Sequence, residues 1–545
     1  MKKYIKIPAL CMLIYSVMSC SQFLETSPKG LLYPDTYYTT EANLESALAG
    51  VYSTLGSSRV YGNGYVQDMA NDADETYWNR STYTYGPRIF DYSPADPSIT
   101  FLWQTLYDGI GRANMLLYKL PAADVSDGVK KRIEGEALFL RAYFYFLLVQ
   151  NFGRVPLELE PKFTPDNLDT PQSDIAAVYE VITTDMERVL TEDLVMSIDK
   201  IGYGGRVTKS AVRGILARVY LTMAGYPLND GTKYEDARRC LLAIIEDSEF
   251  THELNSDYSQ IFINYAADKY DTKESIWEVE FWGNRGDVYT ETGTIGGING
   301  IGNSIDESIG LAGGQLKATG VIFKLYEEGD LRRDRSIAPF TYYSIDDPAN
   351  PGNSIAAKSP CDPANSWQRF IGKYRREEET LKPKVAHQTP INFPLLRFSD
   401  VLLMYAEVEN EINLGPTPEA YDAINQVRRR AFGKLLPGAV NISEYDLSGL
   451  DYDTFTQTLR DERSRELCFE SLRRFDLIRW GFFVPRMNSI VEIIESDMSS
   501  ISGAGNRPPD YSVRGFRNVS AKHLLHPIPS KEMSLNRNLK QNHGW

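Results

Sequence analysis

The chain has 545 residues, of which 42% are hydrophobic and 24% charged. These shares are typical of globular proteins and exclude a disordered or fibrous chain. With 58 Lys and Arg residues against 73 Asp and Glu, the formal net charge is −15 at pH 7. Contacts with nucleic acid or an anionic membrane surface need clustered Lys and Arg. The composition therefore excludes nucleic acid as a partner and disfavours a polybasic membrane contact.

The first 40 residues predict a secreted, lipid-anchored protein. Lys2, Lys3 and Lys6 precede an apolar run over residues 7–18, which is shorter than the ~20 residues that span a bilayer and has the layout of a signal peptide. Cys20 follows this run directly after a serine, which resembles a bacterial lipobox, whose cysteine is acylated. We expect residues 1–19 to be removed, Cys20 to carry lipid and residues 20–40 to form a tether.

Helical periodicity dominates residues 41–250. Apolar side chains recur at spacings of three and four in six segments, which predicts amphipathic helices that pack in pairs. The array is similar in architecture to tetratricopeptide-type helical hairpins, although that repeat's signature spacing is absent. The predicted helices cover residues 41–55, 101–117, 133–152, 173–190, 208–224 and 234–246.

The middle of the chain has a different pattern. Residues 276–282 alternate between apolar and polar side chains, which predicts a strand. Residues 283–314 are rich in Gly, Thr, Asn and Ser, and residues 341–366 in Pro, Asn and Ser. Both segments are expected to be long irregular excursions, which in compact proteins are usually functional or disordered.

Helical patterns return in the C-terminal part, at residues 401–412, 420–427 and 455–480. The last of these segments is dense in charge, and its pairs Asp461/Arg465 and Glu470/Arg474 have the i,i+4 spacing of helical ion pairs. We interpret this charge run as a structural lattice of ion pairs between helices and not as an active site.

The sequence carries no recognisable catalytic or metal-binding motif. His252-Glu253 is not followed by a second His four residues later, and the glycine-rich segment matches neither a phosphate-binding loop nor a dinucleotide fingerprint. We therefore expect no metal, no cofactor and no enzymatic activity. The acidic cluster at residues 72–75 leaves open a glycosidase-type pair of carboxylates, and a solvated acidic loop is the competing interpretation.

Aromatic side chains outside the helical patterns are the candidate ligand-binding residues. Six rings lie between Tyr61 and Tyr85, and others flank the two excursions. Aromatic faces stack on the apolar faces of sugar rings, and large rigid side chains give contact area at a low entropy cost. For any single ring, packing of a loop onto the helices is the alternative. The candidates are Trp78, Asn79, Arg80, Tyr83, Trp282, Arg285, Tyr289 and Trp367.

A series of short motifs, in order along nearly the whole chain, resembles the SusD/RagB family of outer-membrane lipoproteins of Bacteroidota. Cys20 is followed by Phe-Leu-Glu and Pro28 at the start of the chain. The later motifs are ALAGVY (47–52), YDGIGRAN (107–114), EALFLRAYFY (136–145), FGRVP (152–156), LRFSDVLLMYAE (396–407), RDER (460–463), PIP (527–529) and QNHGW (541–545).

The resemblance implies one mainly α body over residues 41–545, with a tetratricopeptide-like scaffold and a few short strands. Its parts would be helical at 41–250, loop-rich and ligand-binding at 251–395, and helical again at 396–545. Arg141, Arg397 and Glu407 would be buried polar or ion-pair positions. Residues 230–390 carry few family motifs, so the identity of the ligand does not follow from the resemblance.

The function implied is non-catalytic. Such a lipoprotein is exposed on the outer membrane and captures oligosaccharides, or less often peptides, for a SusC-like TonB-dependent transporter that it covers as a lid. Two other classes stay open at this point. One is a secreted helical glycoside hydrolase, and the other is a structural helical-repeat lipoprotein of outer-membrane assembly.

Overall fold

The computed structural model describes residues 37–70, 73–163, 169–282, 293–500 and 508–545. About 50% of the chain is helical and the strands are few and short, which confirms the predicted mainly α fold. The predictions for the signal peptide, for lipid on Cys20, and for Arg285 and Tyr289 lie outside the described residues.

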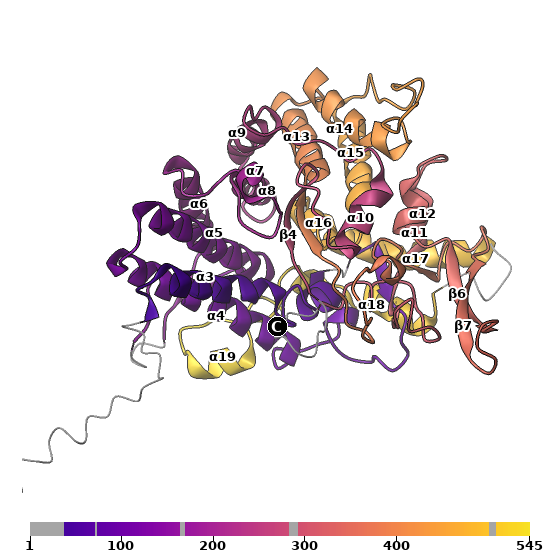
Figure 1. Cartoon of the computed structure of the whole chain (residues 1–545), viewed down its shortest axis with the longest axis horizontal. Coiled ribbons are helices and arrows are strands. Elements are labelled where there is room, and N and C mark those ends of the chain that lie inside the picture. The colour runs from indigo at the N-terminus through magenta and orange to yellow at the C-terminus, as the bar shows by residue number, and fades with distance from the viewer. Residues whose placement is uncertain (1–36, 71–72, 164–168, 283–292, 501–507) are drawn as a thin grey trace, which may run out of the picture.

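The N-terminal part is an array in which α3, α4, α5, α6, α8 and α9 each pack against the next of these helices (Figure 1). All six predicted helices are present, and the Thr208 hydroxyl caps one of them by accepting a hydrogen bond from the Ala211 N–H at 3.2 Å. The helices are α3 (Glu41–Gly56), α4 (Pro97–Lys119), α5 (Asp127–Phe152), α6 (Ile175–Thr191), the short α7 (Ile198–Ile201), α8 (Lys209–Ala224) and α9 (Lys233–Ile245).

The C-terminal part continues this array, because α13 packs against α8 and α9. Short helices of the middle region then pack against α15. The C-terminal helices are α13 (Phe398–Asn413), α14 (Pro418–Ala431), α15 (Tyr452–Leu467), α16 (Arg473–Arg479), α17 (Phe483–Ser500), α18 (Asp510–Asn518) and α19 (Ser530–Leu535). The middle helices are α10 (Tyr258–Ala266), α11 (Gly320–Leu325) and α12 (Arg332–Ser336).

The strands form small antiparallel sheets between the helices. One sheet has three strands in the order β1 (Thr76–Trp78), β5 (Leu316–Ala318), β8 (Arg369–Phe370). The others are pairs: β2 (Val155–Pro156) with β3 (Gln172–Ser173), β4 (Ser275–Val279) with β9 (Phe393–Arg397), and β6 (Phe340–Asp346) with β7 (Ser354–Pro360).

One sequence prediction about the middle region is corrected and another is confirmed. Residues 341–366 are not irregular throughout, because most of them form the β6–β7 hairpin. The predicted strand at 276–282 is confirmed as β4, and all five of its side chains are buried. The reason is its place inside the core, where Trp277 packs edge-on against Phe139 and Tyr143 of α5.

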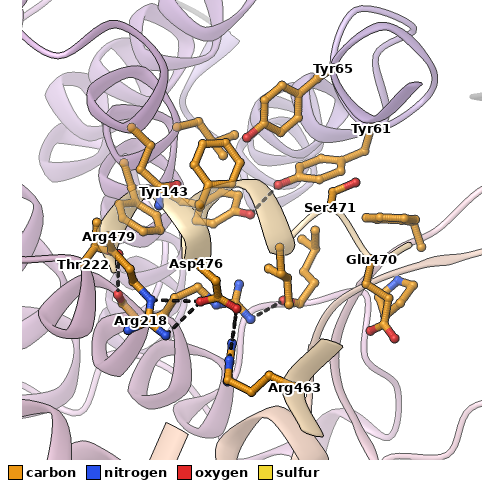
Figure 2. A pocket seen from close by; sticks show the side chains of 18 residues that line it. Tyr61, Tyr65, Tyr143, Arg218, Thr222, Arg463, Glu470, Ser471, Asp476 and Arg479 are labelled. Atoms are coloured by element: carbon orange, nitrogen blue, oxygen red, sulfur yellow. Dashed lines mark hydrogen bonds and ion pairs between the residues drawn. The ribbon is translucent and has the colours of Figure 1, made fainter. Parts of the chain in front are cut away.

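The core encloses a small cavity of about 40 Å³ among α5, α8, β9 and the start of α16. Figure 2 shows hydroxyl groups and charged side chains around it, including the hydroxyls of Tyr61 and Tyr143, which lie 2.6 Å apart. Tyr65 also lines it. Its volume is far below the several hundred Å³ of small-ligand pockets. Tyr61 and Tyr65, expected among the ligand-binding rings, therefore pack the core.

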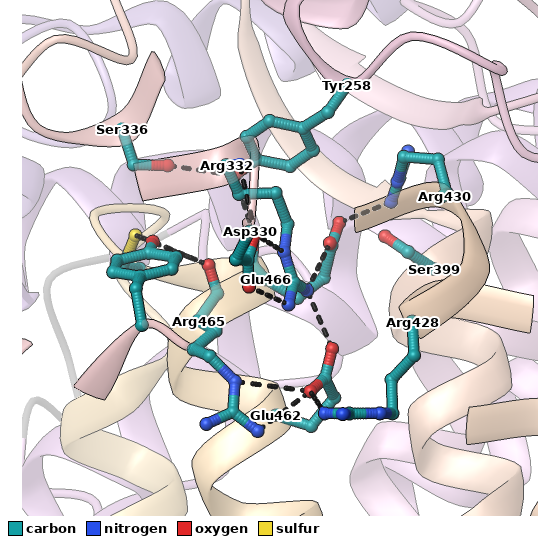
Figure 3. A network of polar contacts seen from close by, with 12 residues as sticks. Tyr258, Asp330, Arg332, Ser336, Ser399, Arg428, Arg430, Glu462, Arg465 and Glu466 are labelled. Atoms are coloured by element: carbon teal, nitrogen blue, oxygen red, sulfur yellow. Dashed lines mark hydrogen bonds and ion pairs between the residues drawn. The ribbon is translucent and has the colours of Figure 1, made fainter. Parts of the chain in front are cut away.

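A buried network of charges joins the middle region to the C-terminal helices (Figure 3). Glu466 of α15 pairs with Arg332 at 3.1 Å, with Arg397 at 2.9 Å and with Arg430 at 2.7 Å. Glu462, one turn earlier, pairs with Arg332 at 2.7 Å. All five side chains have no exposed surface. The interpretation of this charge run as a structural lattice is confirmed.

The two ion pairs predicted from i,i+4 spacing in that run are wrong. Arg465 pairs with Glu462 at 2.9 Å, and Glu470 pairs with Lys373 at 2.7 Å. The predicted single helical region over 455–480 is divided between α15 and α16, and Phe469 in the break has a left-handed backbone with φ of 65°. The break turns Glu470 away from its own helix and towards the middle region.

The ion-pair roles expected for the family-like motifs are confirmed. Arg141 of α5 pairs with Asp185 of α6 at 2.8 Å. Glu407 of α13 accepts a hydrogen bond from Arg479 of α16 at 2.7 Å. These pairs connect helices that are adjacent in space, so the motifs encode the scaffold.

Candidate functional site

The three-stranded sheet brings together three segments that the sequence had singled out separately. Thr76 of β1 lies opposite Ala318 of β5, just after the glycine-rich excursion, and Lys317 lies opposite Phe370 of β8, just after the second excursion. The aromatic-rich loop that follows β1, residues 79–93, is therefore attached to both excursions. We refer to it as the aromatic loop.

A cluster of three side chains gives the aromatic loop its shape. The rings of Trp78 and Tyr83 are stacked, with centroids 5.9 Å apart and planes 21° apart. The Arg88 guanidinium lies 3.8 Å from the Trp78 ring centroid and 4.7 Å from that of Tyr83, at distances typical of cation–π contacts. Arg88 Nε donates to Asp68 at 2.5 Å. The cluster thus combines an aromatic stack with the positive charge of Arg88, which Asp68 holds in place.

The other polar groups of the loop are held by segments far away in the sequence. Asn79 N–H donates to the carbonyl of Gln315 at 2.9 Å, and the Tyr511 hydroxyl of α18 donates to Asn79 Oδ1 at 3.1 Å. Arg80 is exposed and donates through one nitrogen to the carbonyl of Gly313 at 2.8 Å. Since a guanidinium carries five N–H donors, Arg80 retains donors for a ligand.

Exposure separates the predicted rings into supporting and accessible ones. Trp78 is 3% exposed, so the expectation that it stacks on a ligand is corrected: its ring supports Tyr83 and Arg88. Tyr83 is half-buried, and Tyr85 is 49% exposed. The accessible aromatic surface of the loop therefore belongs to the two tyrosines.

Two further predicted rings lie apart from this surface. Trp367 is fully buried and its Nε1–H donates to Asp497 of α17 at 3.0 Å, so its predicted ligand contact is corrected as well. Its ring packs near Tyr77, with centroids 6.2 Å apart, and Tyr77 is buried too. Trp282 follows β4 and is 43% exposed. It stays a candidate, at a place in the chain separate from the aromatic loop.

The acidic cluster before β1 is buried and not solvated, which corrects the expected acidic loop. Asp74 pairs with Arg473 at 2.9 Å and with Arg486 at 2.6 Å. Burial opposes ionisation of Asp74, but the two guanidiniums outweigh it and lower its pKa to about 2. Burial raises the pKa of Glu75 to about 7. Both carboxyls are therefore bonded to residues of the helical scaffold, Asp74 to the two arginines and Glu75 to the Ser464 hydroxyl of α15. Asp72 lies outside the described residues.

Two surface grooves have the volume of small-ligand pockets. One, of about 380 Å³, lies between α3, the segment before α8 and β4, and includes Tyr203, Arg206 and Glu280. The other, of about 320 Å³, lies between α5, α8, α16 and the C-terminal segment, and is mostly apolar. Neither contains a residue of the aromatic loop.

In the parts of the chain that the structure describes, no three or more His, Cys, Asp or Glu side chains are grouped so as to hold a metal ion. Among the same residues, no helix has the length and apolar character needed to cross a membrane.

Sequence reasoning missed Arg88 and the contribution of α18. Arg88 lies in the same aromatic-rich segment as Tyr83, so an arginine close to a run of rings was a usable signal. Tyr511 and Ser512 of α18 both lie more than 400 positions after the loop in the sequence. Tyr511 bonds to Asn79 of the loop, and Ser512 lines a cavity together with Trp78 and Arg88. No local pattern in the sequence connects the two.

The family of the chain is shown by comparison with known proteins. The model of the SusD family matches residues 273–545, and a model described as "Starch-binding associating with outer membrane" matches residues 22–221. SusD-like protein P25 of Formosa agariphila is 27% identical, with 96% of this chain and 95% of that protein covered. A SusD-like protein of Bacteroides ovatus is 26% identical, over 89% of this chain and 84% of the other.

Solved structures agree with these matches. A SusD homologue from Bacteroides thetaiotaomicron superposes with a TM-score of 0.82 at 28% identity, covering 94% of this chain and 98% of the other. A laminarin-binding SusD-like protein has a TM-score of 0.67 at 23% identity, covering 93% of this chain and 100% of the other, which supports the fold alone. The helical scaffold, its buried ion pairs and these matches lead to one conclusion: the chain belongs to the SusD family.

Proposed function

We propose that this protein is a non-catalytic surface lipoprotein that captures oligosaccharides and delivers them to a SusC-like TonB-dependent transporter of the outer membrane. The family supports this role, and solved structures of similar fold carry the names "laminarin binding SusD-like protein" and "surface glycan-binding protein A". The observation that carries the proposal is the aromatic loop, where accessible tyrosine rings lie beside exposed hydrogen-bonding groups.

In this proposal the ring of Tyr83 or Tyr85 stacks on the apolar face of a sugar, while Asn79 and Arg80 bond its hydroxyl groups. Trp78 and Arg88 hold Tyr83 in place from behind. Stacking of this kind uses rigid side chains, so little conformational entropy is lost on binding. Trp282, Arg285 and Tyr289 extend the proposed ligand-binding set beyond the loop.

Replacing Tyr83 with alanine is expected to weaken glycan binding about five- to thirtyfold. Loss of an aromatic anchor at a binding surface typically removes about 1–2 kcal/mol, and 1.4 kcal/mol corresponds to a factor of ten in Kd. Calorimetric titration of the soluble chain lacking residues 1–20 against a panel of oligosaccharides measures the change. Tyr118→Ala, at a 57% exposed tyrosine of α4, is the matched control and should bind normally.

The same titration separates the sugar proposal from its alternative. If no oligosaccharide binds while peptides do, the cargo is peptide and the role of the aromatic loop in sugar stacking is refuted. A glycoside hydrolase would instead degrade the glycan and lose this activity on a single Asp→Asn change. The acidic cluster at 74–75 does not support this, since both carboxyls serve the scaffold.

Membrane attachment is proposed to depend on Cys20 alone. Cys20→Ala should release the protein into the soluble fraction, because one or two acyl chains supply the binding that the acidic body lacks. Fractionation of cells followed by a salt wash tests this, and retention of the variant on the washed membrane would contradict it. Wild-type protein should co-purify with a TonB-dependent barrel, whereas an assembly barrel as the main partner would favour a structural role.

A further inference from the structure

A small cavity lies beneath the aromatic loop, between β1, the 3-10 turn at Pro87–Ile89, and helices α17 and α18. Its volume is about 20 Å³. Side chains of four distinct elements reach it, so it sits where the loop is joined to the C-terminal helices. Its lining includes Thr76, Trp78, Arg88, Met487, Ser512 and Phe516.

Two polar atoms of this lining have no hydrogen-bond partner among the described residues: Trp78 Nε1 and Ser512 Oγ. Both residues are only 3% exposed, so bulk solvent does not satisfy them. The indole N–H is a donor only, whereas a serine hydroxyl both donates and accepts. Buried polar groups in folded proteins are almost always satisfied by protein atoms or by ordered water.

Since no protein atom of the described residues bonds to either group, the question is whether the cavity is large enough to hold an ordered water molecule. A site that holds a water molecule needs at least about 10–15 Å³ and two or more polar partners. The cavity beneath Trp78 has room for one molecule of this size, and its lining residues Trp78 and Ser512 carry one obligate donor and one hydroxyl. A purely apolar cavity would stay dry, but two of the residues that line this one, Trp78 and Ser512, carry an unsatisfied polar atom.

We propose that a single ordered water molecule occupies this cavity, accepts a hydrogen bond from Trp78 Nε1–H and donates one to Ser512 Oγ. Ser512 is thereby a positioning residue: it fixes the edge of the Trp78 ring, on which Tyr83 stacks and over which Arg88 lies. The water site stands on geometry alone. Only its effect on ligand affinity rests on the proposed function.

This water completes a three-point attachment of the aromatic loop to α18. Tyr511 donates to Asn79 Oδ1 at 3.1 Å, and Asn518 Nδ2 donates to the carbonyl of Ile89 at 2.8 Å. Ser512 lies one residue after Tyr511 and connects, through the water, to Trp78. A helix near the C-terminus therefore sets the geometry of a loop that begins at residue 79.

Nuclear magnetic resonance of the soluble chain with ¹⁵N-labelled tryptophan tests the water directly. The Trp78 indole signal, identified as the one missing from Trp78→Phe, should show magnetisation transfer to a long-lived water. In Ser512→Ala this transfer should be lost, the Trp78 signal should shift, and its N–H should exchange with solvent about fivefold faster. The Trp367 indole, bonded to Asp497, and the variant Ser534→Ala in α19 should show no change.

Two outcomes overturn the proposal. The water site is refuted if wild-type Trp78 shows no transfer to water and a high-resolution crystal structure has no density within hydrogen-bond distance of both atoms. The positioning role of Ser512 is refuted if Ser512→Ala leaves the Trp78 signal unchanged. Neither readout involves a glycan, so failure of the proposed function would leave both intact. With the water in place, Ser512→Ala should weaken glycan binding about threefold, by disordering the Tyr83 support.

Discussion

Glu466→Gln is expected to lower the free energy of unfolding by about 3–5 kcal/mol, the usual result when one partner of a buried ion pair is removed. The Glu466 carboxylate faces three guanidiniums, those of Arg332, Arg397 and Arg430, with no exposed surface on any of the four side chains. Glutamine keeps the shape of the side chain but not its charge. The three cations would then share only the remaining carboxylates of the network.

The same network predicts how the free energy of unfolding changes as the pH is lowered. Burial opposes ionisation of Glu466 and of Glu462, but the surrounding guanidiniums outweigh it and hold the pKa of Glu466 well below its usual range and that of Glu462 at about 2. A carboxyl with a depressed folded-state pKa stabilises the fold above its unfolded pKa, near 4.5, and loses that contribution as the pH falls. Wild-type stability should therefore decline from about pH 4.5 towards pH 2, and Glu466→Gln should show less of this decline.

Urea unfolding at pH 7, followed by circular dichroism, measures the effect. The control is Glu192→Gln, which breaks the pair Arg188–Glu192, whose side chains are 41% and 51% exposed. Solvent screens such a pair, so the control should stay within about 1 kcal/mol of wild type. An equally small change in Glu466→Gln would show that the network contributes little net stability.

Much of the scaffold was predictable because its helices follow from the local spacing of apolar residues. The six N-terminal helices follow from apolar spacing, and the predicted segment that starts at residue 208 begins where the Thr208 hydroxyl caps α8. The partners of Glu466 were not predictable, since they come from α12, β9 and α14. Spacing within one helix pointed to the wrong pairs because the chain leaves helical geometry at Phe469.

The candidate site was predictable in part. A run of rings beside Asn79 and Arg80 identified the aromatic loop, and the three-stranded sheet does join it to both excursions. Which rings are accessible was not predictable. Arg88 covers the Trp78 ring, and Trp367 is buried where its Nε1–H bonds to Asp497 of α17. Composition identifies an aromatic segment, but only tertiary packing decides which faces remain open.

Glu278→Gln is expected to stabilise the protein at alkaline pH, in contrast to Glu466→Gln. Glu278 of β4 is 2% exposed, and the groups that act on its carboxyl among the described residues are two hydrogen-bond donors and two acids, with no cation. It accepts hydrogen bonds from the Ser275 hydroxyl at 2.5 Å and from Asn392 Nδ2 at 2.9 Å. Burial raises its pKa to about 7 despite these bonds, and the nearby charges of Glu280 and Asp268 raise it further.

The sign of the pH effect follows from this raised pKa. The folded state binds the Glu278 proton more tightly than the unfolded state, so the associated stability is complete below about pH 4.5 and is lost as the pH rises through 7. The loss is on the order of 3 kcal/mol at pH 8.5. Glutamine resembles the protonated acid: its oxygen accepts from Asn392, and its amide donates to Ser275 Oγ. The variant therefore avoids the loss.

Unfolding free energies measured between pH 4.5 and 8.5 should thus diverge with rising pH, and Glu278→Gln should be the more stable protein at the upper end. The exposed Glu249 provides a control, since Glu249→Gln alters the charge without altering a buried site. If Glu278→Gln instead destabilises equally at all pH values, the carboxylate is ionised in the folded protein and serves β4 as a charged acceptor. Because Glu278 lines the 380 Å³ groove, the same titration also reports whether Glu278 contributes a negative charge to that groove at neutral pH.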